Sequence, residues 1–374
     1  MVSDGLNDNR TESVLIIGAG PAGLATAASL KRLGIKFALL DRSGEAGGAF
    51  RQMPRDMRLL SPRPYVNLPH HSYPGKENYP AMPDYENYLK EYAARFQLVP
   101  ERQEISDLKK TNGGFEVRCV STQTIQCRFV VVATGMFGNP IWPEIPGLTR
   151  QITEPAVLHA HDWKGANGLR GQRILIIGSG ISGVSIAEEC ANAGAQVLVS
   201  RRSGRTRLVP RQLLGVDILH WFRPVEFLPR SFFGRWCERG IHSPAYNCGY
   251  RAMVANGKIM ELPGVRQIDG RKITFMDGRS EEVDMIVAAT GYEYKTPFLP
   301  TAIERAQGGH PVARGCESTE WPGLFFVGSP CARRIDSEFL RGIASDAVHV
   351  ARRIQLSLKQ LSFSVPPNAT AIPR

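Results

Sequence analysis

The sequence predicts an α/β fold built from two copies of one unit, in which a buried strand leads through a glycine-rich turn into a helix and a second strand. The first copy contains VLIIGAGPAG at residues 14–23, and the second contains ILIIGSGISG at residues 174–183. Two further β-rich runs, FVVVATG at 129–135 and MIVAATG at 285–291, each end in Ala-Thr-Gly. A chain of 374 residues is long enough for two or three domains.

The composition is that of an ordinary soluble globular protein, because 43% of the residues are apolar and 22% are charged. No apolar run is long enough to cross a bilayer, and the polar N-terminal stretch lacks the apolar region of a signal peptide. We therefore expect a cytoplasmic protein with no membrane partner.

The formal net charge of +11 raises the question of nucleic-acid binding. The Lys and Arg residues are dispersed and accompany no recognisable nucleic-acid module. We therefore expect no nucleic-acid partner and attribute the charge to the attraction of anionic cofactors and substrates. The seven cysteines include no C-x-x-C and no zinc-binding spacing, so we expect reduced, mostly structural thiols and no metal site.

The first unit has the residue order of a Rossmann-like dinucleotide-binding domain. Residues 13–17 (SVLII) predict a buried parallel strand, and LATAASLKRLG predicts the helix after the turn. In the turn, Gly18 permits a tight bend, Gly20 lets a pyrophosphate approach the backbone, and Gly23 lets helix and strand pack closely. Asp41 ends the next strand about twenty residues later, where an acidic side chain can hold ribose hydroxyls.

The second unit repeats this order, but its second strand ends in Ser200 where the first unit has Asp41. Arg201 and Arg202 follow directly. Guanidinium groups bind the 2′-phosphate that an acidic side chain would repel, so this unit predicts NADPH rather than NADH. The alternative is that the two arginines form a solvated surface pair.

The paired glycines in RSGEAGGAF extend the first unit beyond what a nicotinamide site needs. With them the chain resembles the two-dinucleotide-binding-domain flavoproteins, in which such a pair contacts FAD. The resemblance implies FAD in the first site and NADPH in the second, with a hydride passing between them. In that family Ala-Thr-Gly segments mark the crossings between domains, so the NADPH domain is expected to be inserted into the FAD domain. The expected limits are 12–150 and 286–360 for the FAD domain, 151–285 for the NADPH domain, and a poorly ordered tail at 361–374.

The same resemblance implies cofactor contacts in the two glycine turns, around the two strand ends that follow them, in the two Ala-Thr-Gly segments and in GLFFVGS. They are Gly18, Gly20, Pro21, Ala22, Gly23, Asp41, Arg42, Gly48, Ala49, Phe50, Ala133, Thr134, Gly135, Gly178, Ser179, Gly180, Ser182, Gly183, Arg201, Arg202, Thr290, Gly291 and Gly328.

In layout the chain resembles the class B flavin-containing monooxygenases, including the short plant auxin-biosynthesis type. TEPAVLHAHDW is similar to the family signature F-x-G-x-x-x-H-x-x-x-[FYW] at His159 and Trp163, and it departs from that signature at Thr153 and Pro155. Ser61 lies near the position where many members carry an Asn that contacts nicotinamide and flavin. The resemblance therefore implies His159 and Ser61 as candidate catalytic residues.

The resemblance also implies a reaction. NADPH reduces FAD, O2 then gives a flavin C4a-hydroperoxide, and a small organic substrate takes one oxygen atom, while the protein excludes water and needs no catalytic triad. Segment 205–256, rich in aromatic and apolar residues, is the expected source of substrate identity or, alternatively, a packing excursion of core residues. The sequence leaves a homodimer open.

Other functions remain open. An NADPH-dependent disulfide reductase shares the nested domains but needs a redox-active cysteine pair, normally C-x-x-C, which the sequence lacks. A reductase or a flavin-dependent oxidase without its own dithiol is therefore the main alternative to a monooxygenase, and an NADPH sensor without turnover is another.

Overall fold

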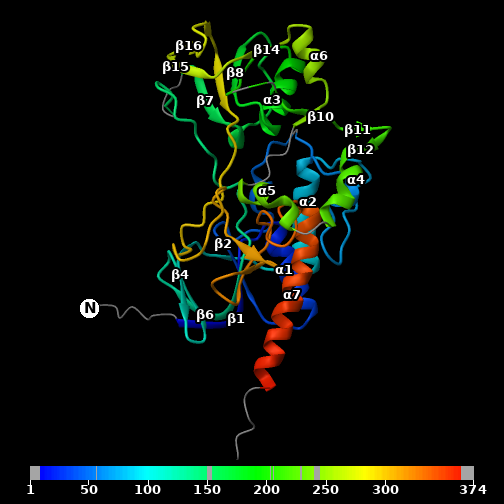
Figure 1. The fold of residues 1–374 in the computed structure, drawn as a ribbon, viewed down its shortest axis with the longest axis vertical. Helices are drawn as coiled ribbons and strands as arrows, with labels where there is room; N and C mark the ends of the chain where they lie inside the picture. The colour runs from blue at the N-terminus through cyan, green and yellow to red at the C-terminus, as the bar shows by residue number, and fades with distance from the viewer. Residues whose placement is uncertain are drawn as a thin grey trace, which may run out of the picture.

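The computed structural model describes residues 9–55, 57–149, 154–202, 204, 206–227, 230–239 and 245–363. Figure 1 shows two lobes stacked along the long axis of the molecule, with β1, β4 and β6 in one and β8, β14 and β15 in the other. Thr153, the expected domain limit at 150–151 and the part of the expected tail beyond residue 363 lie outside the described residues.

The first lobe is built on a sheet with the strand order β19-β20-β21-β6-β1-β2-β3, in which β21, β6, β1, β2 and β3 run parallel. The antiparallel hairpin of β4 and β5 adjoins β6. The strands are β1 (Asn9–Ile17), β2 (Ala38–Asp41), β3 (Glu101–Arg102), β4 (Ile105–Thr111), β5 (Gly114–Cys119), β6 (Thr124–Val132), β19 (Ala313–Arg314), β20 (Glu317–Ser318) and β21 (Leu324–Phe326).

Helices α1 (Pro21–Arg32) and α7 (Leu340–Phe363) cover this sheet. Every residue of α1 from Pro21 to Leu30 is buried, because α1 packs against both the end of β1 and α7. Apolar residues of α7 recur at 343, 347, 350, 351 and 354, which places them on one buried face.

Helix α2 (Met82–Arg95) holds a loop of the first lobe through three buried tyrosines. Tyr85, Tyr88 and Tyr92 recur at helical spacing and therefore share one face. Their hydroxyls donate hydrogen bonds of 2.6–3.1 Å to backbone carbonyls in the loop at 66–71. The loop that carries Ser61 is thereby anchored to α2 through its later residues, 66–71.

The second lobe is built on a parallel sheet with the order β14-β9-β8-β18-β7. One face packs on α3 and α6, and the other packs on the antiparallel strands β15 and β16, which continue to β17. The elements are β7 (Ala156–His159), η3 (Ala160–Asp162), β8 (Arg173–Ile177), α3 (Ile181–Asn192), β9 (Gln196–Ser200), α6 (Tyr250–Ala255), β14 (Ile259–Leu262), β15 (Val265–Asp269), β16 (Lys272–Phe275), β17 (Ser280–Glu282) and β18 (Met285–Ala288).

The order of these sheets confirms the predicted fold class. The first sheet takes its strands from residues 9–132 and 313–326, and the second takes its strands from 156–288, so the second lobe is inserted into the first. Strand β18 belongs to the second sheet and begins at Met285, so that sheet continues past the expected limit at 285. Helix α7 continues to Phe363, three residues into the expected tail. The domain limits themselves remain predictions.

Between β9 and α6 lies a connecting segment, residues 206–247. Its elements are β10 (Leu208–Pro210), β11 (Gln212–Leu213), β12 (Val216–Asp217), α4 (Ile218–Phe222), η4 (Arg223–Phe227), η5 (Arg230–Phe233), α5 (Gly234–Arg239) and β13 (Ala245–Asn247).

The connecting segment docks on the first lobe through polar contacts. Arg211 donates a hydrogen bond to the carbonyl of Leu59 at 3.2 Å, and its guanidinium carbon lies 3.4 Å from the ring centre of Tyr79. The Tyr79 hydroxyl donates to Asp217, which belongs to the segment. The segment lies between two elements of the second lobe in sequence and is held by residues of the first lobe.

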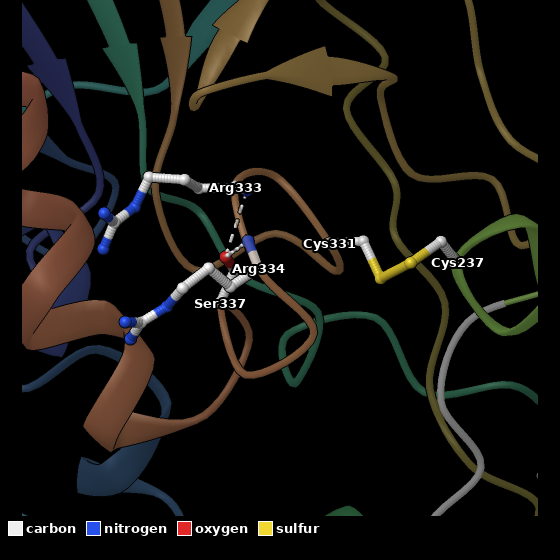
Figure 2. Close-up of a disulfide and its surroundings, with 5 residues drawn as sticks. All are labelled: Cys237, Cys331, Arg333, Arg334 and Ser337. Carbon is white, nitrogen blue, oxygen red and sulfur yellow. Dashed lines mark hydrogen bonds between the residues drawn. A yellow bond between two sulfur atoms is a disulfide. The ribbon is translucent and has the colours of Figure 1, made fainter. Parts of the chain in front are cut away.

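A disulfide adds a covalent tie to this docking. Cys237 of α5 is bonded to Cys331 in the loop after β21, with Cα atoms 5.6 Å apart and a sequence separation of 94. Figure 2 shows the bond and, elsewhere on the same loop, the Ser337 hydroxyl, which accepts the backbone N–H groups of Arg333 and Arg334 at 3.1 and 2.9 Å. The expectation of reduced thiols is wrong for this pair, because tertiary packing joins two cysteines whose spacing carries no sequence signal.

The disulfide leads to a test of stability. Cys331→Ser should lower the free energy of unfolding by about 2–4 kcal/mol, because the bond closes a long loop in the unfolded chain. Chemical denaturation without reductant measures this change, and Cys248→Ser, which removes an exposed free thiol, is the control. Alkylation of unfolded, unreduced protein should label the five free cysteines, whereas labelling of all seven would show that the pair is not bonded.

Candidate dinucleotide sites and their junction

In each glycine turn the first and third glycines are required by the fold itself. Gly18 has a φ of +106° and Gly178 a φ of +112°, in the region that other residues rarely adopt. A Cβ on Gly23 would stand 1.8 Å from the carbonyl oxygen of Gly18, and a Cβ on Gly183 would stand 2.0 Å from that of Gly178. Helix and strand therefore approach to backbone contact in both lobes.

The middle glycine of each turn has no such structural reason. Gly20 has φ −76° and ψ −173°, and Gly180 has φ −79° and ψ −167°, which are extended values open to any residue. Among the described atoms, a Cβ on Gly20 would meet only the Cα of Gly48, at 3.9 Å, and a Cβ on Gly180 would meet nothing within 4 Å.

These two positions are the N-caps of α1 and α3. Free backbone N–H groups and the positive end of the helix dipole attract phosphate at such a cap. A pyrophosphate can approach the backbone closely only if no side chain fills the space at the cap. Glycine at these two positions leaves that space open, and the fold gives no other reason for glycine there. The residues present therefore fit two dinucleotides, one in each lobe.

Asp41, at the end of β2, braces the first turn. Its Oδ2 accepts the N–H of Ala19 at 2.8 Å, and its Oδ1 accepts the N–H and the hydroxyl of Ser43 at 2.8 and 2.6 Å. A carboxylate offers about four acceptor positions, so one remains for a ribose hydroxyl. The guanidinium of Arg42 lies beside Gly138, where a Cβ would be 2.8 Å from its Nη2.

The helical turn η1 (Gly48–Arg51) packs directly against the first glycine turn and carries Ala49 and Phe50. The N–H of Gly47 donates to the carbonyl of Ala19 at 2.9 Å, and the ring of Phe50 meets that of Tyr85 edge to face at 5.1 Å. The glycine pair identified in the sequence thus lies next to the expected phosphate position.

The other predicted FAD contacts gather at the carboxyl ends of neighbouring parallel strands, where open α/β sheets bind ligands. Ala133, Thr134 and Gly135 follow β6, and Gly328 follows β21. A Cβ on Gly328 would stand 3.2 Å from the Cβ of Ala22, which with Pro21 begins α1. One edge of the first sheet therefore holds all these residues.

The two predicted 2′-phosphate ligands have different surroundings. Arg201 is partly buried and its Nε lies 3.4 Å from Oε2 of Glu261 on the neighbouring strand β14, whose carboxylate also accepts the Tyr250 hydroxyl at 3.1 Å. Arg202 is exposed. Part of the charge of Arg201 is therefore balanced by Glu261. The sequence carries no signal for this acid, because it lies about 60 positions away along the chain.

The two chain crossings between the lobes are bonded to each other. The N–H of Ile141 donates to the carbonyl of Gly291 at 3.0 Å, and the hydroxyl of Thr290 donates to the carbonyl of Ile141. Ser179 and Ser182 lie half-buried in the second glycine turn, and β18 leads directly from that sheet into this crossing. The second Ala-Thr-Gly segment therefore belongs to both the second sheet and the junction.

His159 lies at the same junction, at the end of β7. Its side chain is fully buried between the rings of Trp142 and Tyr292, with ring centres 5.6 and 5.4 Å away. Its Nδ1 accepts the N–H of His161 at 3.0 Å. Burial, with a smaller effect of His161, lowers the pKa of His159, so the imidazole is neutral at pH 7.

The second signature residue, Trp163, and the candidate Ser61 both lie apart from the aromatic cluster around His159. Trp163 is buried in the second lobe, where its Nε1 donates to Glu189 of α3 at 2.9 Å. Ser61 lies half-buried in the first-lobe loop, two residues after Leu59, the carbonyl that accepts from Arg211. The structure thus places His159 at the junction and Ser61 beside the docked connecting segment, and their catalytic roles remain predictions.

The open helix caps lead to a test with an internal contrast. Gly20→Val should abolish FAD binding and Gly180→Val should abolish NADPH binding, each with a stability change of about 1 kcal/mol, because only ligand space is filled. Gly23→Val should instead prevent folding, because its Cβ meets backbone. The ratio of flavin to protein absorbance, NADPH titration and circular dichroism measure the three outcomes, and full FAD occupancy in Gly20→Val would contradict the assignment.

Comparison with known proteins agrees with this arrangement. A family model described as pyridine nucleotide-disulphide oxidoreductase matches residues 15–216. The probable indole-3-pyruvate monooxygenase YUCCA8 of Arabidopsis thaliana is 29% identical over 92% of this chain and 90% of its own length.

Two solved structures are similar in fold. The flavin-containing monooxygenase of Stenotrophomonas maltophilia has a TM-score of 0.74 and 21% identity over 93% of this chain and 99% of its own. Bacillithiol disulfide reductase Bdr of Staphylococcus aureus has a TM-score of 0.72 and 22% identity over 93% of this chain and 99% of its own. Together with the site geometry, the family match places the chain in the pyridine nucleotide-disulphide oxidoreductase family, as an FAD-dependent oxidoreductase that is similar to flavin monooxygenases in sequence and fold.

Proposed function

We propose that the protein is an NADPH-dependent monooxygenase that transfers one oxygen atom from O2 to a small organic molecule through a flavin C4a-hydroperoxide. The observation that carries the proposal is the pair of open helix caps at Gly20 and Gly180 on two lobes whose crossings are hydrogen-bonded to each other. Bound FAD would supply the redox and oxygen chemistry, and the side chains of this chain would bind, orient and exclude water.

The buried aromatic cluster at the junction supports the last of these tasks. His159, Trp142 and Tyr292 meet where the crossings meet, and burial keeps His159 neutral. A neutral, buried imidazole brings no counterion and no hydration shell to the junction. We infer that this cluster fixes the second lobe against the first and keeps water from the space between the two dinucleotides.

The cysteine pair favours a monooxygenase over a disulfide reductase. A reductase passes electrons through a thiol pair that its partner disulfide can reach. Cys237 is 2% exposed and Cys331 is fully buried, and both lie in the docking contact of the connecting segment. The pair therefore suits a structural tie better than exchange with an external disulfide.

The substrate class is a proposal from the relatives. Several similar proteins are named for indole-3-pyruvate, an aromatic 2-oxo acid, which makes this compound the first substrate to assay. The positive net charge of the chain suits an anionic substrate.

Cofactor preference provides a test of the second site. Arg202→Ala should raise the KM for NADPH about ten- to a hundredfold and leave that for NADH unchanged, because one charge-assisted contact to the 2′-phosphate is lost. Arg201→Ala should act in the same direction, since it also leaves Glu261 without its cation. The control Lys258→Ala removes a cation just before β14. Because β14 runs parallel to β9, this residue lies at the opposite end of the strands from Arg201 and Arg202. Equal effects on both cofactors would contradict the assignment.

The monooxygenase reaction is tested by following reduced enzyme mixed with oxygen in a stopped-flow spectrometer, where a transient oxygen adduct of the flavin is expected. In steady state, His159→Ala should release several times more hydrogen peroxide per NADPH consumed than the wild type, because its cavity admits water to the junction. His161→Ala is the comparison variant: it keeps the backbone bond to Nδ1 of His159 and removes only an edge contact with the Tyr292 ring at 6.1 Å, so it should release less peroxide than His159→Ala.

Two results would count against this function. Flavin reduction by NADPH with no oxygen adduct would favour a reductase, and bound flavin that NADPH does not reduce would favour a sensor. Unchanged peroxide release in His159→Ala would remove the role proposed for the junction while leaving the cofactor assignment intact.

A further inference from the structure

The connecting segment carries an unusual surface. Six large apolar side chains between β11 and η4 are solvent-exposed, with Leu214 84%, Phe222 54% and Trp221 50% exposed. We call this set the apolar face, and it consists of Leu213, Leu214, Val216, Trp221, Phe222 and Val225. Figure 1 shows β11, β12 and α4 together at the outer edge of the molecule, away from both sheets. Single exposed apolar residues are ordinary, but such a concentration in thirteen consecutive positions (213–225) marks a contact surface.

The charges around the apolar face have one sign. Residues 206–227 contain two acidic side chains, Asp217 and Glu226, and both are buried and directed into the protein. Asp217 accepts from the Tyr79 hydroxyl, and Glu226 is paired with Arg341 of α7. The exposed charged side chains of the same stretch are both arginines.

These arginines are Arg207 and Arg223, and His220 is exposed between them in sequence. An apolar projection bordered by cations is the arrangement with which peripheral proteins enter the headgroup region of an anionic bilayer. Trp is suited to that region because its indole is largely apolar and carries one N–H donor. Phe and Leu are typical of the apolar face that enters it. None of the helices in the described residues has the length and apolar content needed to cross a bilayer.

We propose that the apolar face is a peripheral attachment site for an anionic lipid membrane. A second copy of this chain fits less well, because a two-fold contact through this face would bring its cations together on a molecule of net charge +11. A nucleic acid fits less well, because aliphatic Leu and Val side chains at the centre of the face have no role in phosphate or base contact. The proposal revises the expectation of no membrane partner, which rested on the absence of a spanning run.

The attachment is independent of the proposed reaction and is tested without it. Full-length protein with FAD bound is sedimented with vesicles of phosphatidylcholine and phosphatidylserine at a ratio of about 7:3, or of phosphatidylcholine alone. We expect binding to the anionic vesicles to be at least about tenfold stronger and to weaken with added salt. Trp221→Phe should remove a blue shift of tryptophan emission that appears only with vesicles.

Matched variants locate the contact. The double variant Leu214→Glu, Trp221→Glu should lose about tenfold or more in vesicle binding, whereas Val99→Glu, on a first-lobe residue that is 79% exposed, should lose none. Arg207→Glu should lose about fivefold or more, and Arg352→Glu on α7, with the same change of net charge, should lose much less. Retained flavin and unchanged circular dichroism show that each variant is folded.

Three results would overturn the proposal. In the first, the wild type sediments with neither vesicle, or equally with both. In the second, the double variant binds as well as the wild type. In the third result, analytical ultracentrifugation without vesicles shows a dimer that the double variant converts to monomer, which would assign the apolar face to a second copy of this chain.

Discussion

Both lobes depend on the same close backbone contact within the glycine-rich turn. In each turn, the carbonyl oxygen of the first glycine occupies the space that a Cβ on the third glycine would need. In the first lobe the ideal Cβ of Gly23 falls 1.8 Å from that oxygen, and in the second lobe the distance at Gly183 is 2.0 Å. The contact sets the helix N-terminus against the strand end and turns its free N–H groups toward one open space. The contact involves backbone atoms only, so it does not depend on the side chains that pack around it. It therefore recurs in both lobes, although α1 packs on α7 whereas α3 packs on α6.

The predictable part of the structure is the part governed by local periodicity. The apolar runs around Val14 and Ile174 are strands because parallel sheets are covered on both faces, which leaves no polar alternation in the sequence. Asp41 could be located because a strand of known start has a nearly fixed length. The insertion of one lobe into the other was implied by resemblance and is confirmed by the strand order.

The unpredicted features all depend on residues that are distant in sequence. Glu261 reaches Arg201 from another strand, and Cys237 reaches Cys331 across 94 residues. The departures of TEPAVLHAHDW from the family signature left the surroundings of His159 open, and only the crossing segments reveal them. Composition predicts that the connecting segment lines a pocket or packs as core. In the structure many of its large apolar side chains are exposed, and the segment docks on the first lobe through polar contacts instead.

The inserted lobe leaves and re-enters the first lobe at the same place. Asn139 accepts the N–H of Glu293 at 3.0 Å, and Pro140 and Tyr292 form an antiparallel bridge. The roughly 150 residues between these two points therefore form one long insertion that begins and ends at adjacent positions of the first lobe. Replacing the insertion by a short turn would leave the pairing of β6 with β21 unchanged. The second lobe is thus joined to the first at two adjacent points, and its replacement by another domain would require no change in the register of the first sheet.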